Sequence, residues 1–146
     1  MKISFDLDDT LIPAKDEDFE TEGKNLIQKL LGIESIRKGT KGVFEELKNS
    51  RHEVGVYTTS YRGIGRIRFQ FWTYGISTDF IVNEKLNRKR LKEIGKSSSK
   101  YPPAFDVNLH IDDSNGVEME GEKHGFNVII LTKDESDWTN KIIENV

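Results

Sequence analysis

The chain has 146 residues, which suits one domain, and its 22 basic and 25 acidic side chains give a formal net charge of -3. It lacks cysteine, which excludes disulfides, thiolate metal sites and cysteine nucleophiles. The charge balance shows neither the basic footprint of a nucleic-acid-binding protein nor an acidic tail. The N-terminal apolar run is too short for a signal peptide or a membrane span, so we expect a cytoplasmic protein without membrane contact.

Five short apolar runs predict β-strands, and segments with helical spacing separate them. The strands are expected at residues 2–7, 54–57, 80–82, 107–111 and 127–131. The helices are expected at residues 36–48, 62–74, 84–94, 116–124 and 138–146. Strands that alternate with helices favour a mainly parallel sheet that is covered on both faces. We therefore predict a single α/β domain over residues 1–146, with a three-layer, Rossmann-like core and a five-stranded sheet.

Polar side chains gather directly after three of the expected strands. They are Asp6, Asp8, Asp9 and Thr10 after the first strand, Thr58, Thr59 and Ser60 after the second, and Asp112, Asp113 and Ser114 after the fourth. In an open parallel sheet, ligands bind at the edge formed by the carboxyl ends of the strands. The sequence therefore predicts that the three polar clusters meet at that edge.

The five acids of these clusters need a physical reason to converge. Asp, Ser and Thr after a strand often cap the following helix, and capping accounts for one or two residues in each cluster. An EF-hand loop is excluded because Leu11 stands at the sixth loop position, where glycine is required. Converging carboxylates repel one another unless a cation lies among them. Oxygen ligands favour a hard divalent ion, so we expect Mg²⁺.

The second cluster offers groups that bind a phosphate. Its hydroxyl groups and the N-terminus of the following helix form an anion site, with Thr58 and Thr59 as the expected phosphate ligands. Mg²⁺ commonly binds together with a phosphate, and a free carboxylate can attack phosphorus to form an aspartyl-phosphate. A second carboxylate two residues further on can serve as general acid and base. These features together predict phosphoryl transfer.

Three segments of the chain resemble motifs of the haloacid dehalogenase (HAD) superfamily. FDLDDTL resembles the first motif, DxDx[TV]; VGVYTT resembles the second, an apolar strand that ends in Ser or Thr; LHIDDS resembles the fourth, an apolar strand that ends in two acids. The resemblance spans nearly the whole chain. It implies a HAD-like core and Mg²⁺-dependent chemistry through an aspartyl-phosphate. An acid at the position of Asp8 favours phosphoryl chemistry over the cleavage of carbon–halogen bonds.

By position, the resemblance implies a role for each residue of the site. Asp6 would be the nucleophile and a metal ligand. Asp8 would be the general acid and base, and its backbone carbonyl would also bind the metal. Thr58 would bind the transferring phosphoryl group. Asp113 would be the direct metal ligand of the fourth motif, and Asp112 would be its supporting partner.

The third motif of the family is a lysine that balances the charge of the nucleophile and the phosphate. The candidates between the third and fourth expected strands are Lys85, Lys89, Lys92, Lys96 and Lys100. Most of them suit a solvated helix face. Lys100 is favoured because it lies in a loop and shortly precedes a proline pair, and the family often has Lys just before Pro. Lys85 is the alternative because it follows the third strand closely.

The chain leaves no room for a large cap domain. Residues 12–35 are expected to form a flap, as in minimal-cap (C0-like) relatives, although the stretch IPAKDEDFETEGKN also suits an ordinary surface loop. An open site would admit a large or extended phosphorylated substrate, or a second copy of the chain would close it. Phe69 and Trp72 lie off the core stripe of their helix and either mark a contact surface or pack under a loop. The net negative charge disfavours nucleic acid as a partner.

Three functions are compatible with these residues. The leading hypothesis is a Mg²⁺-dependent phosphomonoester hydrolase, a HAD-type phosphatase that acts through an aspartyl-phosphate. The first alternative is a phosphate-binding or regulatory module with weak turnover. The second is a phosphotransferase that passes the group to a sugar, as a phosphomutase does.

Overall fold

A computed structural model describes residues 1–146 and shows an α/β protein whose five-stranded sheet is parallel throughout. The strands are β1 (Lys2–Phe5), β2 (Glu53–Tyr57), β3 (Ile81–Val82), β4 (Leu109–Asp112) and β5 (Asn127–Ile130). The helices are α1 (Leu26–Leu30), α2 (Thr40–Asn49), α3 (Ile64–Thr73), α4 (Glu84–Glu93), α5 (Asn115–His124) and α6 (Trp138–Glu144), with a 3₁₀-helix, η1 (Pro102–Phe105). This arrangement confirms the α/β class and is consistent with the Rossmann-like core expected from the sequence.

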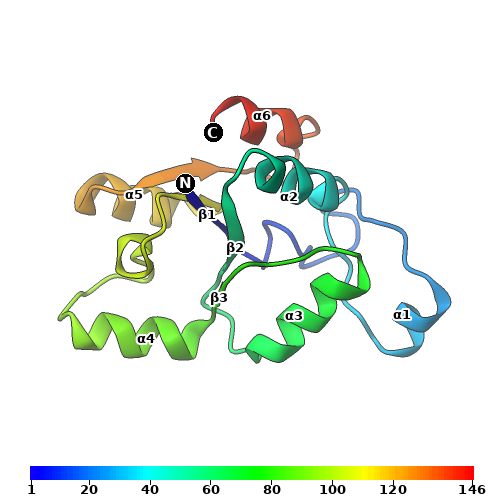
Figure 1. Cartoon of the computed structure of the whole chain (residues 1–146), viewed down its shortest axis with the longest axis horizontal. Helices are drawn as coiled ribbons and strands as arrows, with labels where there is room; N and C mark the ends of the chain where they lie inside the picture. Colours follow the sequence, from blue (N-terminus) through cyan, green and yellow to red (C-terminus); the bar gives the residue numbers. More distant parts are fainter.

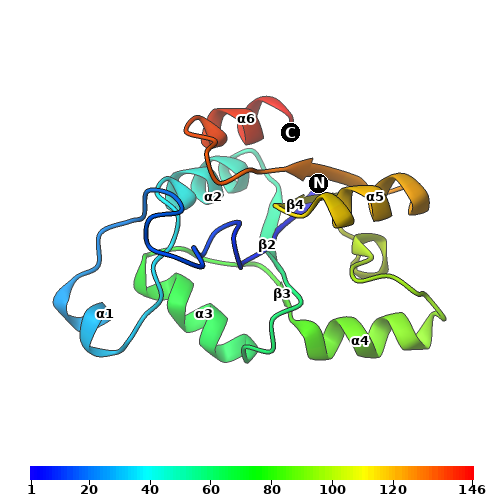
Figure 2. The same ribbon diagram turned by 180° about the vertical axis from the view of Figure 1, so that it is seen from behind.

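β1 is the central strand of the sheet, whose order is β3-β2-β1-β4-β5. Helices cover both faces: α4 and α5 lie on one side of the sheet, and α2 and α3 lie on the other (Figures 1 and 2). α6 packs beside α2. Because β2 and β4 flank β1, the segments that follow these three strands meet at the middle of one edge.

The core is a continuous apolar cluster that joins the sheet to the helices of one side. It contains 20 buried residues. Phe5 of β1, Phe44 of α2 and Phe71 of α3 pack in a row, with ring centroids 5.0 and 5.7 Å apart. Truncating a buried ring of this kind to alanine costs about 3–5 kcal/mol. This packing therefore fixes the position of β1, and with it the position of the residues at its carboxyl end.

Two glycines set the starts of α2 and α3. Gly39 has a φ of 92°, in the left-handed region, so the helix expected from residue 36 begins instead at Thr40. Gly63 is the N-cap residue of α3, which begins at Ile64 and not at residue 62. None of the helices combines the length and the apolar character needed to cross a membrane.

α1 lies within residues 12–35, where the sequence predicted a flap without a helix. Asn25 and Gln28 form a capping box: the side chain of Asn25 accepts a hydrogen bond from Gln28 N (2.8 Å), and that of Gln28 accepts one from Asn25 N (2.9 Å). Gln28 Nε2 also donates to the carbonyl oxygen of Thr73 (3.1 Å), at the end of α3. This part of the flap is therefore a structured element that is attached to α3.

Candidate active site

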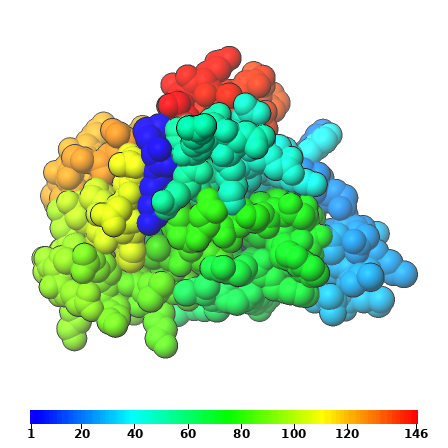
Figure 3. All heavy atoms as spheres, viewed as in Figure 1, coloured from blue at the N-terminus to red at the C-terminus, as the bar shows by residue number.

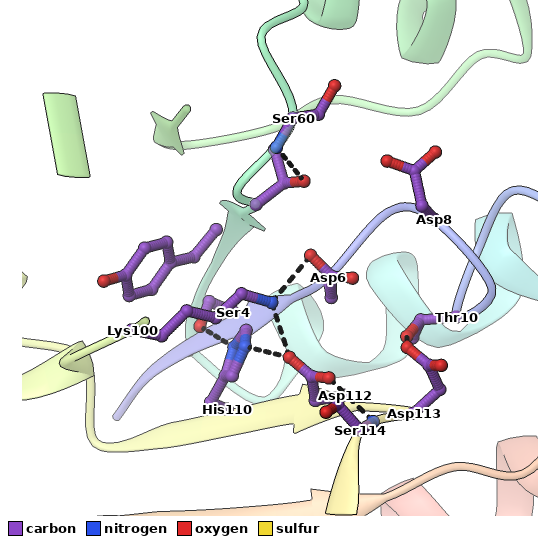
Figure 4. Close-up of polar contacts among 12 residues, drawn as sticks. Ser4, Asp6, Asp8, Thr10, Ser60, Lys100, His110, Asp112, Asp113 and Ser114 are labelled. Atoms are coloured by element: carbon purple, nitrogen blue, oxygen red, sulfur yellow. Dashed lines mark hydrogen bonds and ion pairs between the residues drawn. The ribbon is translucent and has the colours of Figure 1, made fainter. Parts of the chain in front are cut away.

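The carboxyl edge of the sheet carries a cluster of three carboxylates (Figure 4). Asp6 follows β1, Asp112 ends β4, and Asp113 comes next. β1 and β4 pair with Phe5 beside Ile111, so the strand register places Asp6 next to Asp112. One oxygen from each carboxylate lies within 4.8 Å of those from the other two. The first and fourth polar clusters of the sequence therefore lie together in space.

Lys100 lies between two of these carboxylates. Its Nζ is 2.8 Å from Asp6 Oδ1 and 2.5 Å from Asp112 Oδ2, and its side chain is only 4% exposed. Burial disfavours the ammonium charge, but the charges of Asp6 and Asp112 outweigh it and raise the pKa of Lys100. The Asp6 contact is an ion pair between two buried groups. Lys85, the alternative candidate, is exposed on α4.

The loop before η1 is fixed so that Lys100 reaches the cluster. Tyr57 OH, at the end of β2, accepts a hydrogen bond from Tyr101 N (2.9 Å) and donates one to Asn87 Oδ1 (2.5 Å). Asn87 Nδ2 donates in turn to the carbonyl oxygen of Ser99 (2.7 Å). Burial raises the pKa of Tyr57, which keeps this hydroxyl neutral and able to donate. The residues on both sides of Lys100 are therefore tied to β2 and α4.

Asp112 is buried and surrounded by hydrogen-bond donors. Besides Lys100, its oxygens lie 2.8 Å from His110 Nε2 and 2.9 Å from Ser114 N. Burial alone would raise the pKa of Asp112, but the His110 hydrogen bond and the Lys100 charge outweigh burial and lower it. His110 Nδ1 lies 2.7 Å from Ser4 Oγ, so a neutral imidazole can accept from Ser4 and donate to Asp112. Asp112 is thus held as a carboxylate in one orientation.

The negative charges of Asp6 and Asp113 are less well balanced by hydrogen-bond donors and cations than that of Asp112. Burial raises the pKa of Asp6 against the opposing charge of Lys100, and the nearby Asp112 carboxylate adds to the rise. Burial and the same neighbouring carboxylate also raise the pKa of Asp113, which accepts a hydrogen bond from Thr10 Oγ1 (3.1 Å). Both carboxylates would therefore gain from a nearby cation.

Asp8 lies on the other side of Asp6 from Asp112 and points away from the cluster (Figure 4). Its side chain is 52% exposed and forms an ion pair with Arg62 at 2.9 Å. Arg62 also binds both oxygens of Glu34, at 2.9 and 2.6 Å, and donates to Ser60 Oγ (2.8 Å). One guanidinium group therefore links Asp8 to the flap and to the segment after β2.

Thr58 follows β2 and is buried at the same edge of the sheet. Its backbone N donates to the carbonyl oxygen of Val82 (2.9 Å), which fixes the backbone, and its Oγ1 accepts from Ser60 N (3.1 Å). The hydroxyl proton of Thr58 therefore stays available for another acceptor. Thr59 is exposed.

His110 and Arg62 are the two site contacts that the sequence did not indicate. His110 is buried and both of its ring nitrogens have partners, one of which is Asp112. A signal existed, because residues two apart in a strand face the same side. Arg62 donates hydrogen bonds to Glu34 and Asp8, which lie 28 and 54 positions away in the sequence. No local sequence pattern predicts contacts over such separations.

Comparison of the chain with protein-family models, with curated proteins and with solved structures finds no match. The fold and the site define an α/β protein that carries a buried cluster of acids and a lysine at the carboxyl edge of its sheet. Its function is therefore inferred from the residues of that cluster.

Proposed function

We propose that the protein is a Mg²⁺-dependent phosphomonoester hydrolase of the HAD type, with Asp6 as the nucleophile. The observation that carries this proposal is the position of Lys100, buried between Asp6 and Asp112 in the cluster that also contains Asp113. A buried ammonium group at a nucleophilic carboxylate can also neutralise an incoming phosphate. The order of motifs along the chain supports the same reaction.

The residues of the cluster fit a bound Mg²⁺ ion. Three carboxylates and one ammonium leave two net negative charges, which one divalent cation balances. Asp6 is paired with Lys100 at 2.8 Å, and Asp113 accepts only from Thr10 among side chains. Asp6, Asp113 and the carbonyl of Asp8 would hold the ion, while Asp112 would support the site. When bound, Mg²⁺ would supply positive charge that offsets the repulsion between the carboxylates and the phosphate.

The proposed reaction has two steps, and in each step one bond to phosphorus forms while another breaks. In the first, a carboxylate oxygen of Asp6 attacks phosphorus, and the bond from phosphorus to the ester oxygen breaks as Asp8 gives that oxygen a proton. In the second, water attacks phosphorus, Asp8 takes its proton, and the bond to Asp6 breaks to release phosphate. Thr58 can donate its hydroxyl proton to a phosphoryl oxygen, and Lys100 balances the charge that develops there.

The exposure of Asp8 supports an open site. Its side chain is half exposed, so the leaving group of a substrate can extend into solvent. This suits a large or extended phosphate ester. Because the flap contacts Asp8 through Arg62, closure of the site by the flap or by a second copy of the chain would have to move this ion pair.

Turnover of an aryl phosphate tests the proposal. The purified protein should release p-nitrophenol from p-nitrophenyl phosphate with Mg²⁺ and lose that activity in EDTA. Asp6→Asn should remove it, and rapid acid quenching of the wild type should trap a phosphate on Asp6 that mass spectrometry detects. Full activity in Asp6→Asn, or a phosphate trapped on another residue, would show the mechanism to be wrong.

One observation favours the phosphate-binding module as a second candidate. Asp8 is ion-paired with Arg62, which Glu34 holds through two hydrogen bonds, so the acid–base group is engaged elsewhere. A protein that keeps this contact would bind phosphate and turn over slowly. Beryllium fluoride separates the two functions: a stable adduct at Asp6 supports the hydrolase, and its absence together with phosphate binding supports the module.

A further inference from the structure

The surface of α1 and α3 carries an apolar patch that the proposed reaction does not use. Six large side chains are exposed there, which we call the α1–α3 patch: Leu26, Ile27, Leu30, Leu31, Phe69 and Trp72. Leu31 and Phe69 line a common concavity of about 180 Å³, and the rings of Phe69 and Trp72 stack with centroids 5.8 Å apart. The patch is therefore continuous across both helices. Contiguous apolar patches on monomers usually mark interaction sites.

The orientation of α1 shows that this exposure is built into the fold. Gln28, a polar residue, is buried and bonds to Thr73, whereas Leu26 and Leu30 on the outer side are 72% and 78% exposed. An amphipathic helix normally turns its apolar face to the core. α1 does the opposite, and the hydrogen bond from Gln28 to Thr73 holds it in that orientation. The segment containing α1 projects from the body of the molecule at the right of Figure 3.

The rim of the patch is basic. The exposed side chains of Lys29, Arg66 and Arg68 belong to the same two helices, and neither helix contains an acidic residue. Glu34, which lines the same concavity, is bound by Arg62 and lies 4.0 Å from Arg66. The chain as a whole carries a net charge of -3, so this basic rim is a local feature that runs against the overall charge. A partner that matches it is apolar on one side and acidic around that side.

We propose that the α1–α3 patch docks an acidic amphipathic helix of a partner protein. Apolar anchors of the partner would lie on Leu30, Leu31 and Trp72, and its acidic flanks would meet Arg66 and Arg68. The concavity between α1 and α3 is smaller than the roughly 300 Å³ at which small-molecule pockets begin, and it suits one inserted side chain. Pairing with a second copy through the same patch would set the two basic rims against each other.

Fluorescence titration with designed peptides tests this docking on the full chain. The probe is an amphipathic helix of about 18 residues, long enough to form a helix, with leucines on one face and glutamates on the other. A twin peptide with lysines in place of the glutamates is the comparison. Trp72 is 69% exposed and Trp138 is 3% exposed, so a blue shift of emission reports the patch. The acidic peptide should bind at least about tenfold more tightly than its twin, and less tightly as salt rises.

Three variants make the test specific. Leu30→Asp should weaken binding of the acidic peptide about tenfold or more, whereas Met119→Asp, at another highly exposed apolar position, on α5, should not change it. Arg66→Glu combined with Arg68→Glu should reverse the preference between the two peptides. Circular dichroism melting checks that each variant folds, and each altered side chain is exposed, so the fold should persist.

The following outcomes would overturn the proposal. They are equal binding of both peptides, no blue shift with either one, or an unchanged preference in the charge-reversed double variant. A dimer by light scattering that Leu30→Asp dissociates would make a second copy the occupant. Tighter binding to phosphatidylserine vesicles, or to an oligothymidylate, than to the acidic peptide would replace the protein partner with a lipid surface or a nucleic acid.

Discussion

The two halves of the candidate active site differ in how they are held. The half made by Asp6, Lys100 and Asp112 is buried, and strand register and a bonded loop position its charges. The half made by Asp8 and Arg62 is partly exposed and depends on contacts with the flap through Glu34. Breaking a buried ion pair costs about 3–5 kcal/mol, whereas an exposed pair contributes about 0–1 kcal/mol. The first half is therefore preorganised, and the second can rearrange at a lower cost in free energy.

The largest expected effect comes from the buried carboxylate that we propose as the nucleophile. Asp6→Asn should lower aryl phosphate turnover by about 10³-fold or more, because a nucleophile is lost while the shape of the site is kept. The matched control is Asp9→Asn in the same loop. Asp9 has a φ of 62°, which asparagine tolerates, and it pairs with Lys133 outside the cluster. Asp9→Asn should keep most of the activity; a comparable loss in both variants would assign the effect to the loop.

Removal of the buried lysine should affect stability as well as activity. Lys100→Met leaves Asp6 and Asp112 buried without their cation, so the free energy of unfolding should fall by about 3–5 kcal/mol in urea titrations without metal. Turnover should fall with it. Lys85→Met, at an exposed position on α4, should change stability by less than about 0.5 kcal/mol. Similar losses in the two variants would contradict the central position given to Lys100.

A smaller loss of stability is expected from the residue that orients Asp112. His110→Phe removes one donor from Asp112 and one partner from Ser4, at an expected cost of about 1–3 kcal/mol. Ser4 and His110 are joined by a hydrogen bond. The double variant Ser4→Ala, His110→Phe should therefore lose less free energy of unfolding than the sum of the losses in the two single variants. Urea titration of the four proteins measures this coupling. Strictly additive values would mean that the two residues act independently.

A substitution in the exposed half should lower the stability of the protein only slightly, and it should increase the mobility of the flap more clearly. Arg62→Gln should lower the free energy of unfolding by about 1 kcal/mol or less, because its partners are partly solvated. It should also release Glu34, so limited proteolysis within residues 12–35 should become faster. Arg66→Gln is the control, since Arg66 is more exposed and only approaches Glu34 at 4.0 Å. Equal proteolysis rates in the two variants would show that Arg62 does not hold the flap in place.

The smallest effect concerns the flap at alkaline pH. Tyr74 OH donates to the carbonyl oxygen of Glu34 (2.8 Å), and burial raises the pKa of Tyr74 to about 12. In the unfolded chain a tyrosine loses its proton near pH 10. The folded state therefore binds the proton more tightly, and this stabilisation is lost as pH rises from about 10 to about 12. Tyr74→Phe should have a shallower decline of urea midpoint over that range; identical slopes would contradict the role of burial.

The buried half of the site was largely predictable, and the reason is its simple geometry. Short apolar runs that end in acids identify strands, and parallel strands present their carboxyl ends at one edge. The same rule predicts that Asp6, Asp112 and Asp113 lie together, as they do in the structure. The ranking of Lys100 above Lys85 was weaker, because the reach of a lysine depends on the path of its loop. That path is set by Tyr57 and Asn87, whose bonds to the loop have no signature in the sequence.

The exposed half was not predictable in the same way. Arg62 meets Glu34 and Asp8 through side chains that lie far apart in the sequence and follow no period. α1 had a usable signal in the spacing of Asn25 and Gln28, which matches a capping box, but its length of five residues falls below what periodicity detects. Its outward apolar face also contradicts the usual rule for amphipathic helices.

The central place of β1 has a consequence for how the chain folds. Ser4 in β1 and His110 in β4 are hydrogen-bonded although they are 106 residues apart. Parallel pairing over such a separation must close a long loop before it gains contacts, which slows folding. On a ribosome, a separation of this size corresponds to on the order of 10 s of synthesis. During that interval Asp6 has neither Lys100 nor Asp112 beside it, so the candidate active site is not assembled until β4 has emerged and docked.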